Sequence, residues 1–232
     1  MGRRFYGLRR RLRHLAGTEA RVFYLAGCAG DPGAQSATSP ASRKTGQSNP
    51  VVVAVIDTGI DAAHPDIQGQ LWTNPGEIPG NGIDDDDNGY IDDVHGWDFV
   101  NNDNDPHDGH GHGAHVAGTI AAATHNTLGI AGLSWGAKIM TLKGLSDSGS
   151  GPASALAEAV IYAADNGAHI INNSWGGLTS YSPQVLEDAF AYAASAGCLS
   201  IASAGNDGTD LFARAFPEAT FVSQIAWCRM YE

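Results

Sequence analysis

Three side chains suited to proton transfer and hydrogen bonding stand in distinctive settings in this sequence. Asp57 ends an apolar run, His112 begins His-Gly-Ala-His-Val-Ala-Gly-Thr, and Asn206 follows the apolar run Leu199–Ala202. An imidazole transfers protons near neutral pH, and carboxylates and amides supply the hydrogen bonds that such chemistry needs. Each residue alone is an ordinary turn, cap or surface residue. Their joint placement favours one shared site.

Apolar strand-like runs alternate with alanine-rich helical stretches from residue 50 onward. We expect strands over Val51–Ile56, Lys138–Leu142, Ala168–Ile171, Leu199–Ala202 and Phe221–Trp227, and helices over 113–124, 153–165 and 184–196. Nearly continuous apolar strands are typical of a parallel sheet that helices cover on both faces. The alternation predicts an α/β fold with a doubly wound, mainly parallel sheet and a ligand site at the carboxyl ends of its strands.

Five short motifs give residues 50 to 227 a family resemblance. They are Val53-Ala-Val-Ile-Asp57-Thr-Gly-Ile-Asp61, His64-Pro-Asp66, His112-Gly-Ala-His-Val-Ala-Gly118, Ile170-Ile-Asn-Asn-Ser-Trp-Gly176 and Ala204-Gly-Asn206. In this order, they make the chain similar to the subtilisin-like serine peptidases. The resemblance implies a three-layer subtilisin-like fold and hydrolysis of peptide bonds in an extended peptide or protein substrate by an Asp/His/Ser triad.

The same resemblance implies a role for each candidate site residue. His112 is the expected general base, Asp57 orients its imidazole, and Asn206 donates a hydrogen bond to the oxyanion. Two segments resemble the family's substrate-flanking strands, whose backbones pair with an extended peptide. These are Gly149, Ser150 and Gly151, and Ser174, Trp175 and Gly176.

The sequence departs from the family pattern at the nucleophile. The family's serine stands in Gly-Thr-Ser-Met-Ala-x-Pro, and no such motif occurs here; the 26 residues after Asn206 hold one serine, Ser223, in a strand-like run. We therefore expect an inactive peptidase domain, incomplete at its C-terminus, with an apolar sheet face left uncovered. A non-catalytic, calcium-stabilised peptide-binding module is the alternative. Milder departures are Ala114, where threonine is usual, and Gly144, where a β-branched residue is commoner.

An acidic stretch carries a second signal. Oxygen-bearing side chains alternate at Asp84, Asp86 and Asn88, and Gly89 then permits a sharp turn, as in the first half of an EF-hand calcium loop. His95 stands where that loop needs its twelfth-position glutamate, and Asp92 or Asp93 can substitute for it in a shorter loop. We expect Ca²⁺ bound by Asp84, Asp86, Asn88, Tyr90, Asp92 and Asp93. The alternative is a solvated acidic loop.

Two further metal hypotheses concern the region before and around His112. Asp103, Asp105 and Asp108 form a second acidic group where some subtilisin-like enzymes hold calcium. His110, His112 and His115 with Asp108 offer zinc ligands, but their spacing lacks the His-Glu-x-x-His pattern, which disfavours zinc. We expect His115 to be a packed structural histidine.

Charge is distributed unevenly along the chain. Residues 1–50 carry nine Lys/Arg and two Asp/Glu, a balance of +7, whereas residues 51–232 carry four and 23, a balance of −19. So acidic a body repels phosphates, which argues against a nucleic-acid partner and favours divalent cations. No apolar stretch is long enough to span a bilayer.

The N-terminal residues suggest a targeting segment. Residues 1–49 form a basic leader and a flexible linker rich in Gly, Ser, Ala and Pro, and residues 50–232 form the peptidase domain. The leader resembles the start of an export signal, although its apolar part, Val22 to Gly27, is short. A disordered leader or a wrongly chosen start codon is the alternative. Leu25-Ala-Gly-Cys28 resembles a lipoprotein cleavage box, so Cys28 is a candidate for a lipid anchor. We expect a secreted or cell-surface protein of bacterial type.

Overall fold

The computed structural model describes residues 50–176, 183–203 and 224–225. Asn206, Ser223, Cys28 and the predicted leader and linker lie outside these residues. The elements are β1 (Val52–Asp57), η1 (Gln68–Gln70), β2 (Gly96–Asp98), α2 (His112–Ala121), β3 (Lys138–Lys143), α3 (Ala153–Asp165), β4 (Ile170–Asn173), α4 (Gln184–Ser195), β5 (Leu199–Ser203) and β6 (Gln224–Ile225).

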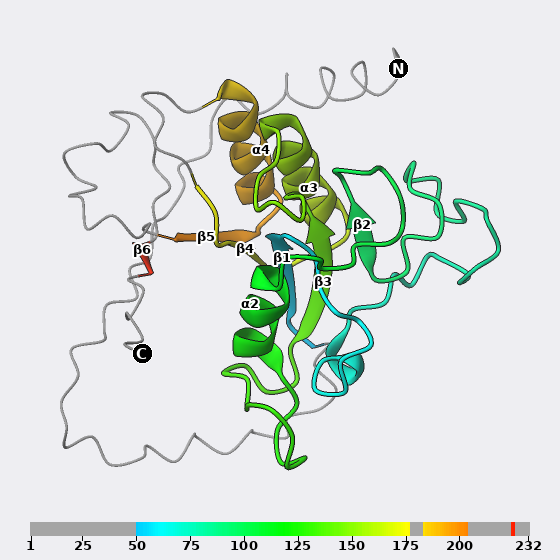
Figure 1. The fold of residues 1–232 in the computed structure, drawn as a ribbon. Coiled ribbons are helices and arrows are strands. Elements are labelled where there is room, and N and C mark those ends of the chain that lie inside the picture. The colour runs from blue at the N-terminus through cyan, green and yellow to red at the C-terminus, as the bar shows by residue number, and fades with distance from the viewer. Residues whose placement is uncertain (1–49, 177–182, 204–223, 226–232) are drawn as a thin grey trace.

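The strands form one sheet in the order β2-β3-β1-β4-β5-β6, and every pair of neighbours is parallel. β1 lies between β3 and β4 near the centre of the sheet, as Figure 1 shows. Starting from β1, the sheet grows on both sides, through β3 and β2 on one side and through β4, β5 and β6 on the other. This is the doubly wound arrangement that the alternation of apolar runs and helical stretches predicts. The structure confirms the α/β class and the parallel sheet.

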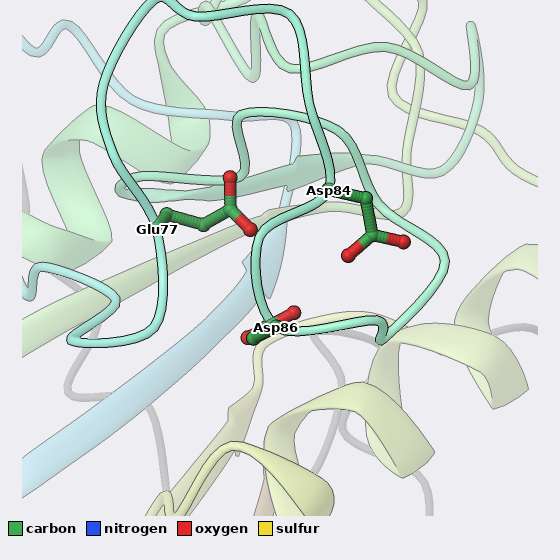
Figure 2. Close-up of side chains that lie close together, drawn as sticks. All are labelled: Glu77, Asp84 and Asp86. Carbon is green, nitrogen blue, oxygen red and sulfur yellow. The ribbon is translucent and has the colours of Figure 1, made fainter.

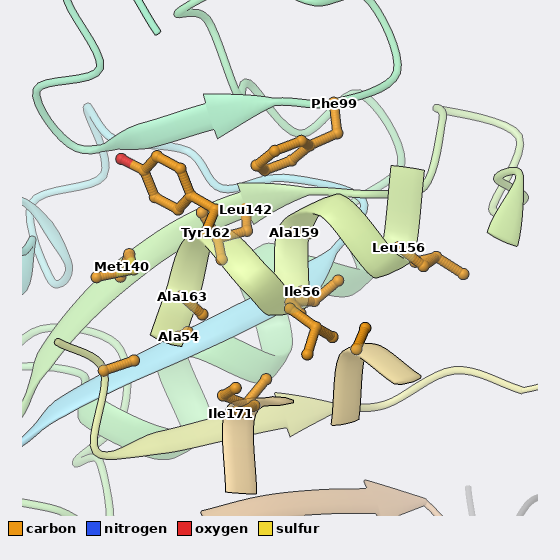
Figure 3. Close-up of a cluster of buried hydrophobic side chains, with 14 of the residues drawn as sticks. Ala54, Ile56, Phe99, Met140, Leu142, Leu156, Ala159, Tyr162, Ala163 and Ile171 are labelled. Atoms are coloured by element: carbon orange, nitrogen blue, oxygen red, sulfur yellow. The ribbon is translucent and has the colours of Figure 1, made fainter. Parts of the chain in front are cut away.

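Helices cover both faces of this sheet and make three layers (Figure 1). On one face, α3 and α4 pack against Ala54, Ile56 and Ile171 in the larger apolar cluster, which Figure 3 shows. On the other face, α2 packs through Val116, Ala117 and Ala121 against alternate residues of β1 and β3. Each central strand is therefore apolar on both sides, which is why its sequence reads as a continuous apolar run.

Helix α3 shows how local sequence sets an element's limits. Pro152 precedes its first residue, where a missing N–H costs nothing, and Gly167 follows its end with a φ of +76°. Leu156, Ala159, Val160 and Ala163 recur at helical spacing and are all buried. The predicted helix over 153–165 is confirmed.

The α2 side of the sheet is less completely covered over β4 and β5. Ile170 and Ile201 are half-buried and Leu199 is 42% exposed, within the part of the chain that the structure describes. Their register beside Val53 and Val55 places them on the α2 side. No helix among the described residues is both long enough and apolar enough to cross a membrane.

Candidate active site

Asp57 and His112 meet at the carboxyl end of β1. His112 Nδ1 lies 2.7 Å from Asp57 Oδ1, the aspartate side chain is fully buried, and the imidazole is 35% exposed. The Thr58 N–H also donates to Asp57 Oδ1 at 2.7 Å, while Asp57 Oδ2 is buried with no hydrogen-bond partner among the described residues. A buried carboxylate thus fixes one ring nitrogen of a histidine whose ring still reaches solvent.

The first turn of α2 approaches the end of β1 closely because its second residue is glycine. A Cβ on Gly113 would lie 2.2 Å from Gly59 O and 3.1 Å from Asp57 Cβ. Any larger residue would push the helix away from the strand and pull His112 off the carboxylate. The His-Gly pair is therefore a geometric requirement of this junction.

The two predicted substrate-flanking segments follow the strands on either side of β1. Gly149, Ser150 and Gly151 come after β3, and Ser174, Trp175 and Gly176 come directly after β4. In the first segment, the Ser146 N–H donates to Ser150 O at 2.8 Å; in the second, the Trp175 ring stacks on Phe190 of α4. A Cβ on Gly149 would lie 3.5 Å from His110 Nε2, and the His110 ring contacts the His112 ring, which brings the first segment close to the candidate base.

Comparison with known proteins decides what this arrangement is. The family model described as "Subtilase family" matches residues 48–224. The chain belongs to the subtilase family. It is 39% identical over 174 residues to the thermophilic serine proteinase of Bacillus sp. (strain AK1), and 37% identical over 176 residues to thermitase of Thermoactinomyces vulgaris. These matches cover 75% and 76% of this chain, but only 37% and 54% of those relatives.

A solved subtilase has the same fold over the matched part. The crystal structure of a cold adapted subtilisin-like serine proteinase is similar with a TM-score of 0.52 and 30% identity. The similarity covers 69% of this chain and 48% of that one. The chain therefore spans about half the length, or less, of these relatives.

The structure accommodates Ala114 and Gly144, the two mild departures from the subtilase pattern. Ala114 contributes its backbone N–H, which donates to Asp108 Oδ2 at 2.8 Å. A Cβ on Gly144 would lie 2.8 Å from Leu156 Cδ2 and 3.1 Å from Ile56 Cγ2, so the Leu156 side chain already takes the space. Neither departure disturbs the Asp57–His112 pair.

The acidic stretch brings three carboxylates together, as Figure 2 shows. Glu77, Asp84 and Asp86 each offer an oxygen within 4.8 Å of the other two. Two of the three are predicted ligands, and Glu77 was missed. Glu77 is buried, and its oxygens accept the N–H groups of Asp85 at 2.9 Å and Asp92 at 3.1 Å. Hard carboxylate oxygens gathered in this way suit a calcium ion.

The other predicted calcium ligands surround this group in different ways. Asn88 Nδ2 donates to Asp86 and Asp93, which ties it to the loop's centre. Asp93 is fully buried and accepts the Tyr162 hydroxyl at 2.5 Å. The Asp92 carboxylate is turned to the backbone instead, because both its oxygens accept N–H groups of residues 80–82. Tyr90 packs its ring on Trp97, Phe99 and Tyr162.

The aromatic contacts join the acidic stretch to the core. Burial, reinforced by the hydrogen bond to Asp93, raises the pKa of Tyr162, so its hydroxyl remains a donor to the carboxylate. Tyr162 belongs to α3, which packs on the central sheet. A buried hydrogen bond thus ties the loop to α3.

The two remaining metal hypotheses gain no support from the placement of side chains. Within residues 50–176 and 183–203, Glu77, Asp84 and Asp86 are the only three His, Cys, Asp or Glu residues placed to share an ion. The zinc set around His112 and the second acidic group therefore do not assemble. The expectation that His115 is packed is also wrong, because it lies on the exposed side of α2. Its side chain reaches solvent one turn after His112.

Proposed function

We propose that this chain supplies the base half of a serine endopeptidase site. The observation that carries the proposal is the 2.7 Å contact between His112 Nδ1 and the buried Asp57 carboxylate. With Nδ1 held as a donor to the carboxylate, the lone pair of the neutral ring stands at Nε2. That atom takes the nucleophile's proton and later returns it to the leaving amine.

Asp57 contributes by orientation and by charge. It holds the imidazole in one tautomer and stabilises the imidazolium that forms when the proton arrives, without itself becoming protonated. In a serine-protease triad, replacing this aspartate by asparagine lowers kcat by about 10⁴. The same loss is expected here wherever a nucleophile completes the site.

The substrate proposed for the site is an extended peptide. The flanking segments leave the sheet on both sides of β1, so a peptide lying between them passes the end of β1, where His112 stands. Extended peptides bind to extended segments of this kind through backbone hydrogen bonds. Asn206 remains the proposed oxyanion donor.

The nucleophile must come from a Gly-Thr-Ser-Met-Ala segment that these 232 residues lack. Without it, His112 has no hydroxyl to deprotonate, and we propose that the chain as given does not cleave peptides. The second candidate is a calcium-stabilised peptide-binding module that uses the flanking segments without chemistry.

A chimera separates these two functions. We would fuse residues 50–206 in register to the C-terminal segment of thermitase that carries the family's serine motif, and measure hydrolysis of a denatured protein substrate. The peptidase proposal predicts hydrolysis that His112→Ala abolishes. A folded chimera that binds peptides yet hydrolyses none would favour the binding module.

We also propose that the acidic stretch binds a structural calcium ion. Glu77 replaces the twelfth-position glutamate of an EF-hand loop, since it reaches Asp84 and Asp86 from the preceding turn. Asn74 Nδ2 donates to Asp86 and Asp93, which orients their carboxylates within the group. A bound cation would neutralise charges that otherwise repel one another. Calcium should raise the melting temperature and a chelator lower it; identical melting curves would refute the site.

An extracytoplasmic location is proposed as well. It is supported by the basic residues at the start of the chain, which resemble those of an export signal. Expression with and without residues 1–28, followed by cell fractionation, tests the location, since a working signal is required for the protein to appear outside the cytoplasm. Lipidation at Cys28 belongs to the same proposal, and the mass of the exported protein, compared between the wild type and Cys28→Ser, tests it.

A further inference from the structure

We infer that Asp108 is a positioning residue, which holds the first turn of α2 so that the His112 ring stays on Asp57. The inference rests on the proposed role of His112 as the base. The hydrogen bonds of Asp108 go to Thr58 and to backbone N–H groups, whereas the His112 ring bonds to Asp57. Its effect passes through the backbone that carries His112.

The start of α2 lacks an ordinary cap. The first N–H groups of a helix have no partner within the helix, and a Ser, Thr, Asp or Asn at the N-cap usually satisfies one of them. Here the N-cap is Gly111, with a φ of +95° and no side chain to accept a hydrogen bond. Because His112 is the first residue of the helix, an unsatisfied first turn would leave the base on a frayed end.

Asp108 supplies the missing cap from three residues upstream. It is 9% exposed, and its Oδ1 accepts the N–H groups of His110 at 2.9 Å and Gly111 at 2.8 Å. Its Oδ2 accepts the Ala114 N–H at 2.8 Å. The carboxylate therefore binds backbone on both sides of His112. A negative charge at a helix N-terminus is also favoured by the helix dipole.

Thr58 joins this cap to the catalytic aspartate. Its Oγ1 donates to Asp108 Oδ1 at 2.8 Å and accepts the Gly113 N–H at 3.0 Å, and its own N–H donates to Asp57 Oδ1. Thr58 is 1% exposed, so these hydrogen bonds are shielded from water. One residue thus fixes the end of β1 relative to the start of α2, and with them the two partners of the pair.

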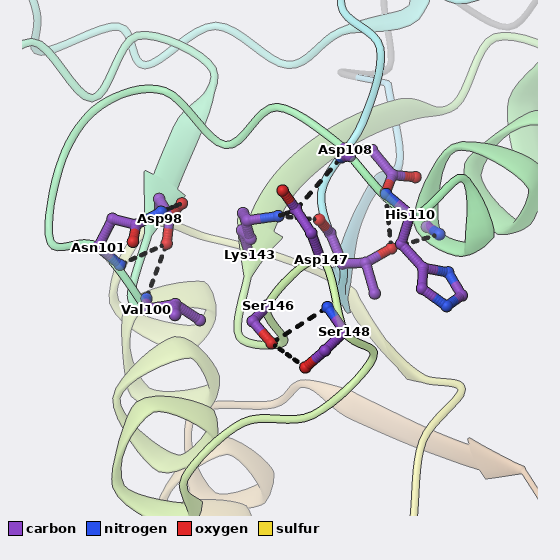
Figure 4. Close-up of polar contacts among 12 residues, drawn as sticks. Asp98, Val100, Asn101, Asp108, His110, Lys143, Ser146, Asp147 and Ser148 are labelled. Carbon is purple, nitrogen blue, oxygen red and sulfur yellow. Dashed lines mark hydrogen bonds and ion pairs between the residues drawn. The ribbon is translucent and has the colours of Figure 1, made fainter.

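The buried Lys143 also holds the junction between β1 and α2. Figure 4 shows it beside Asp147 and Asp108. Lys143 Nζ donates to Thr58 O and to Asp147 Oδ1, both at 2.5 Å. The same Asp147 oxygen accepts the Gly109 N–H at 3.3 Å, next to Asp108. The cap, the strand end and the loop that leads to Gly149 are therefore parts of one hydrogen-bonded network.

A spectroscopic signature of the His112–Asp57 contact tests the inference. In the ¹⁵N-labelled 232-residue chain, a histidine Nδ1 proton held by a carboxylate is protected from exchange and gives a low-field proton resonance. His112→Ala assigns it by removing it. The test variants are Asp108→Asn, which opposes an NH₂ group to backbone donors, and Thr58→Val, which removes the bridging hydroxyl. Thr58→Ser restores that hydroxyl.

The matched control is Glu187→Gln. Glu187 is also a carboxylate in the first turn of a helix, α4, but it is exposed, and α4 packs on the face of the sheet opposite to α2. Circular dichroism melting of every variant separates loss of the contact from loss of the fold.

We expect the resonance to be lost in folded Asp108→Asn and Thr58→Val and kept in Thr58→Ser and Glu187→Gln. Its retention in Thr58→Val, or in folded Asp108→Asn, would overturn the positioning role and leave the proposed function standing. If Asp108→Asn does not fold, the Thr58 pair alone decides. Absence of the resonance from the wild-type chain would contradict the His112–Asp57 pair, and the positioning role would fall with it.

Discussion

Glu77 is a buried carboxyl group whose ionised form is disfavoured by its surroundings. Burial raises the pKa of the Glu77 carboxyl above its ordinary value of 4.5, the N–H of Asp85 lowers it, and the Asp93 charge raises it again. The net effect is upward, so the ionised form is disfavoured in the folded chain. A calcium ion between Glu77, Asp84 and Asp86 would reverse this, because it stabilises the ionised form.

Glu77→Gln should therefore weaken the stabilisation that calcium gives. In chelator, the loss of a disfavoured charge is offset because the new NH₂ group faces the N–H of Asp85 or Asp92, so the melting temperature should stay within roughly 2–4 °C of the wild type, about 1 kcal/mol in a chain of this size. With calcium, the variant should gain less than the wild type, because a ligand is gone. Glu187→Gln should respond to calcium as the wild type does. An equal calcium-induced shift in Glu77→Gln and wild type would exclude Glu77 as a ligand.

The raised pKa of Glu77 also predicts a pH dependence of stability. Between its unfolded value near 4.5 and its higher folded value, the native chain binds the extra proton. The free energy of unfolding contributed by this group therefore falls as pH rises through that window. Urea unfolding of calcium-free wild type and Glu77→Gln across this range should show the fall only in the wild type. Parallel pH profiles would contradict it.

At the scale of elements, the junction between β1 and α2 depends on one glycine in the helix. Gly113→Ala should destabilise the chain by about 1–3 kcal/mol, because its Cβ meets backbone atoms that cannot move aside. Gly118→Ala is the matched control in the same helix, since its Cβ meets only Ile130 Cδ1 at 3.8 Å. It should stabilise by about 0.5–1 kcal/mol through helix propensity. Denaturant midpoints measure both, and equal effects would refute the close approach.

The cap at the start of α2 adds an acid dependence of the opposite sign. Burial alone would raise the pKa of Asp108, but its hydrogen-bond donors lower it below the ordinary value of 3.8. This contribution to stability is present above the unfolded pKa and is lost as pH falls through the lower folded pKa. The destabilisation caused by Asp108→Asn should therefore shrink in strong acid. A constant difference between variant and wild type down to the acid transition would contradict this.

Most elements could be predicted from sequence because their apolar patterns follow directly from burial. The helix predicted over 113–124 ends instead at Ala121, where Ala122 turns extended with a ψ of 143°. The alanines beyond are as helix-favouring as those within, so only tertiary contacts place the end. β2 was missed because its three residues, Gly96–Asp98, lie in a stretch without periodicity.

Some residues of the candidate sites could likewise be predicted from the sequence, and others could not. Asp57 and His112 could be found because strand ends in a parallel sheet converge, and their motifs are family-specific. Glu77 could not, because a ligand supplied by a separate turn has no fixed spacing from the loop that it completes. His115 was misjudged because helical spacing alone does not say which face the neighbouring loops leave open.

In the molecule as a whole, the acidic stretch and the Asp57–His112 pair belong to different strands of one sheet. The acidic stretch precedes β2 at one edge, and the Asp57–His112 pair stands at the central strand. Tyr162 connects the acidic loop to α3, which packs on the same central strands. Calcium should therefore stabilise the whole fold, including the pair, rather than a local loop.

We propose that these residues hold the base half of a subtilase site without its nucleophile. The test is treatment of the folded 232-residue chain and of the thermitase chimera with a serine-directed fluorophosphonate, followed by intact mass measurement. We expect stoichiometric labelling of the chimera, loss of that labelling in His112→Ala, and none in the 232-residue chain. Stoichiometric labelling of the 232-residue chain, at Ser223 or any other serine, would contradict it.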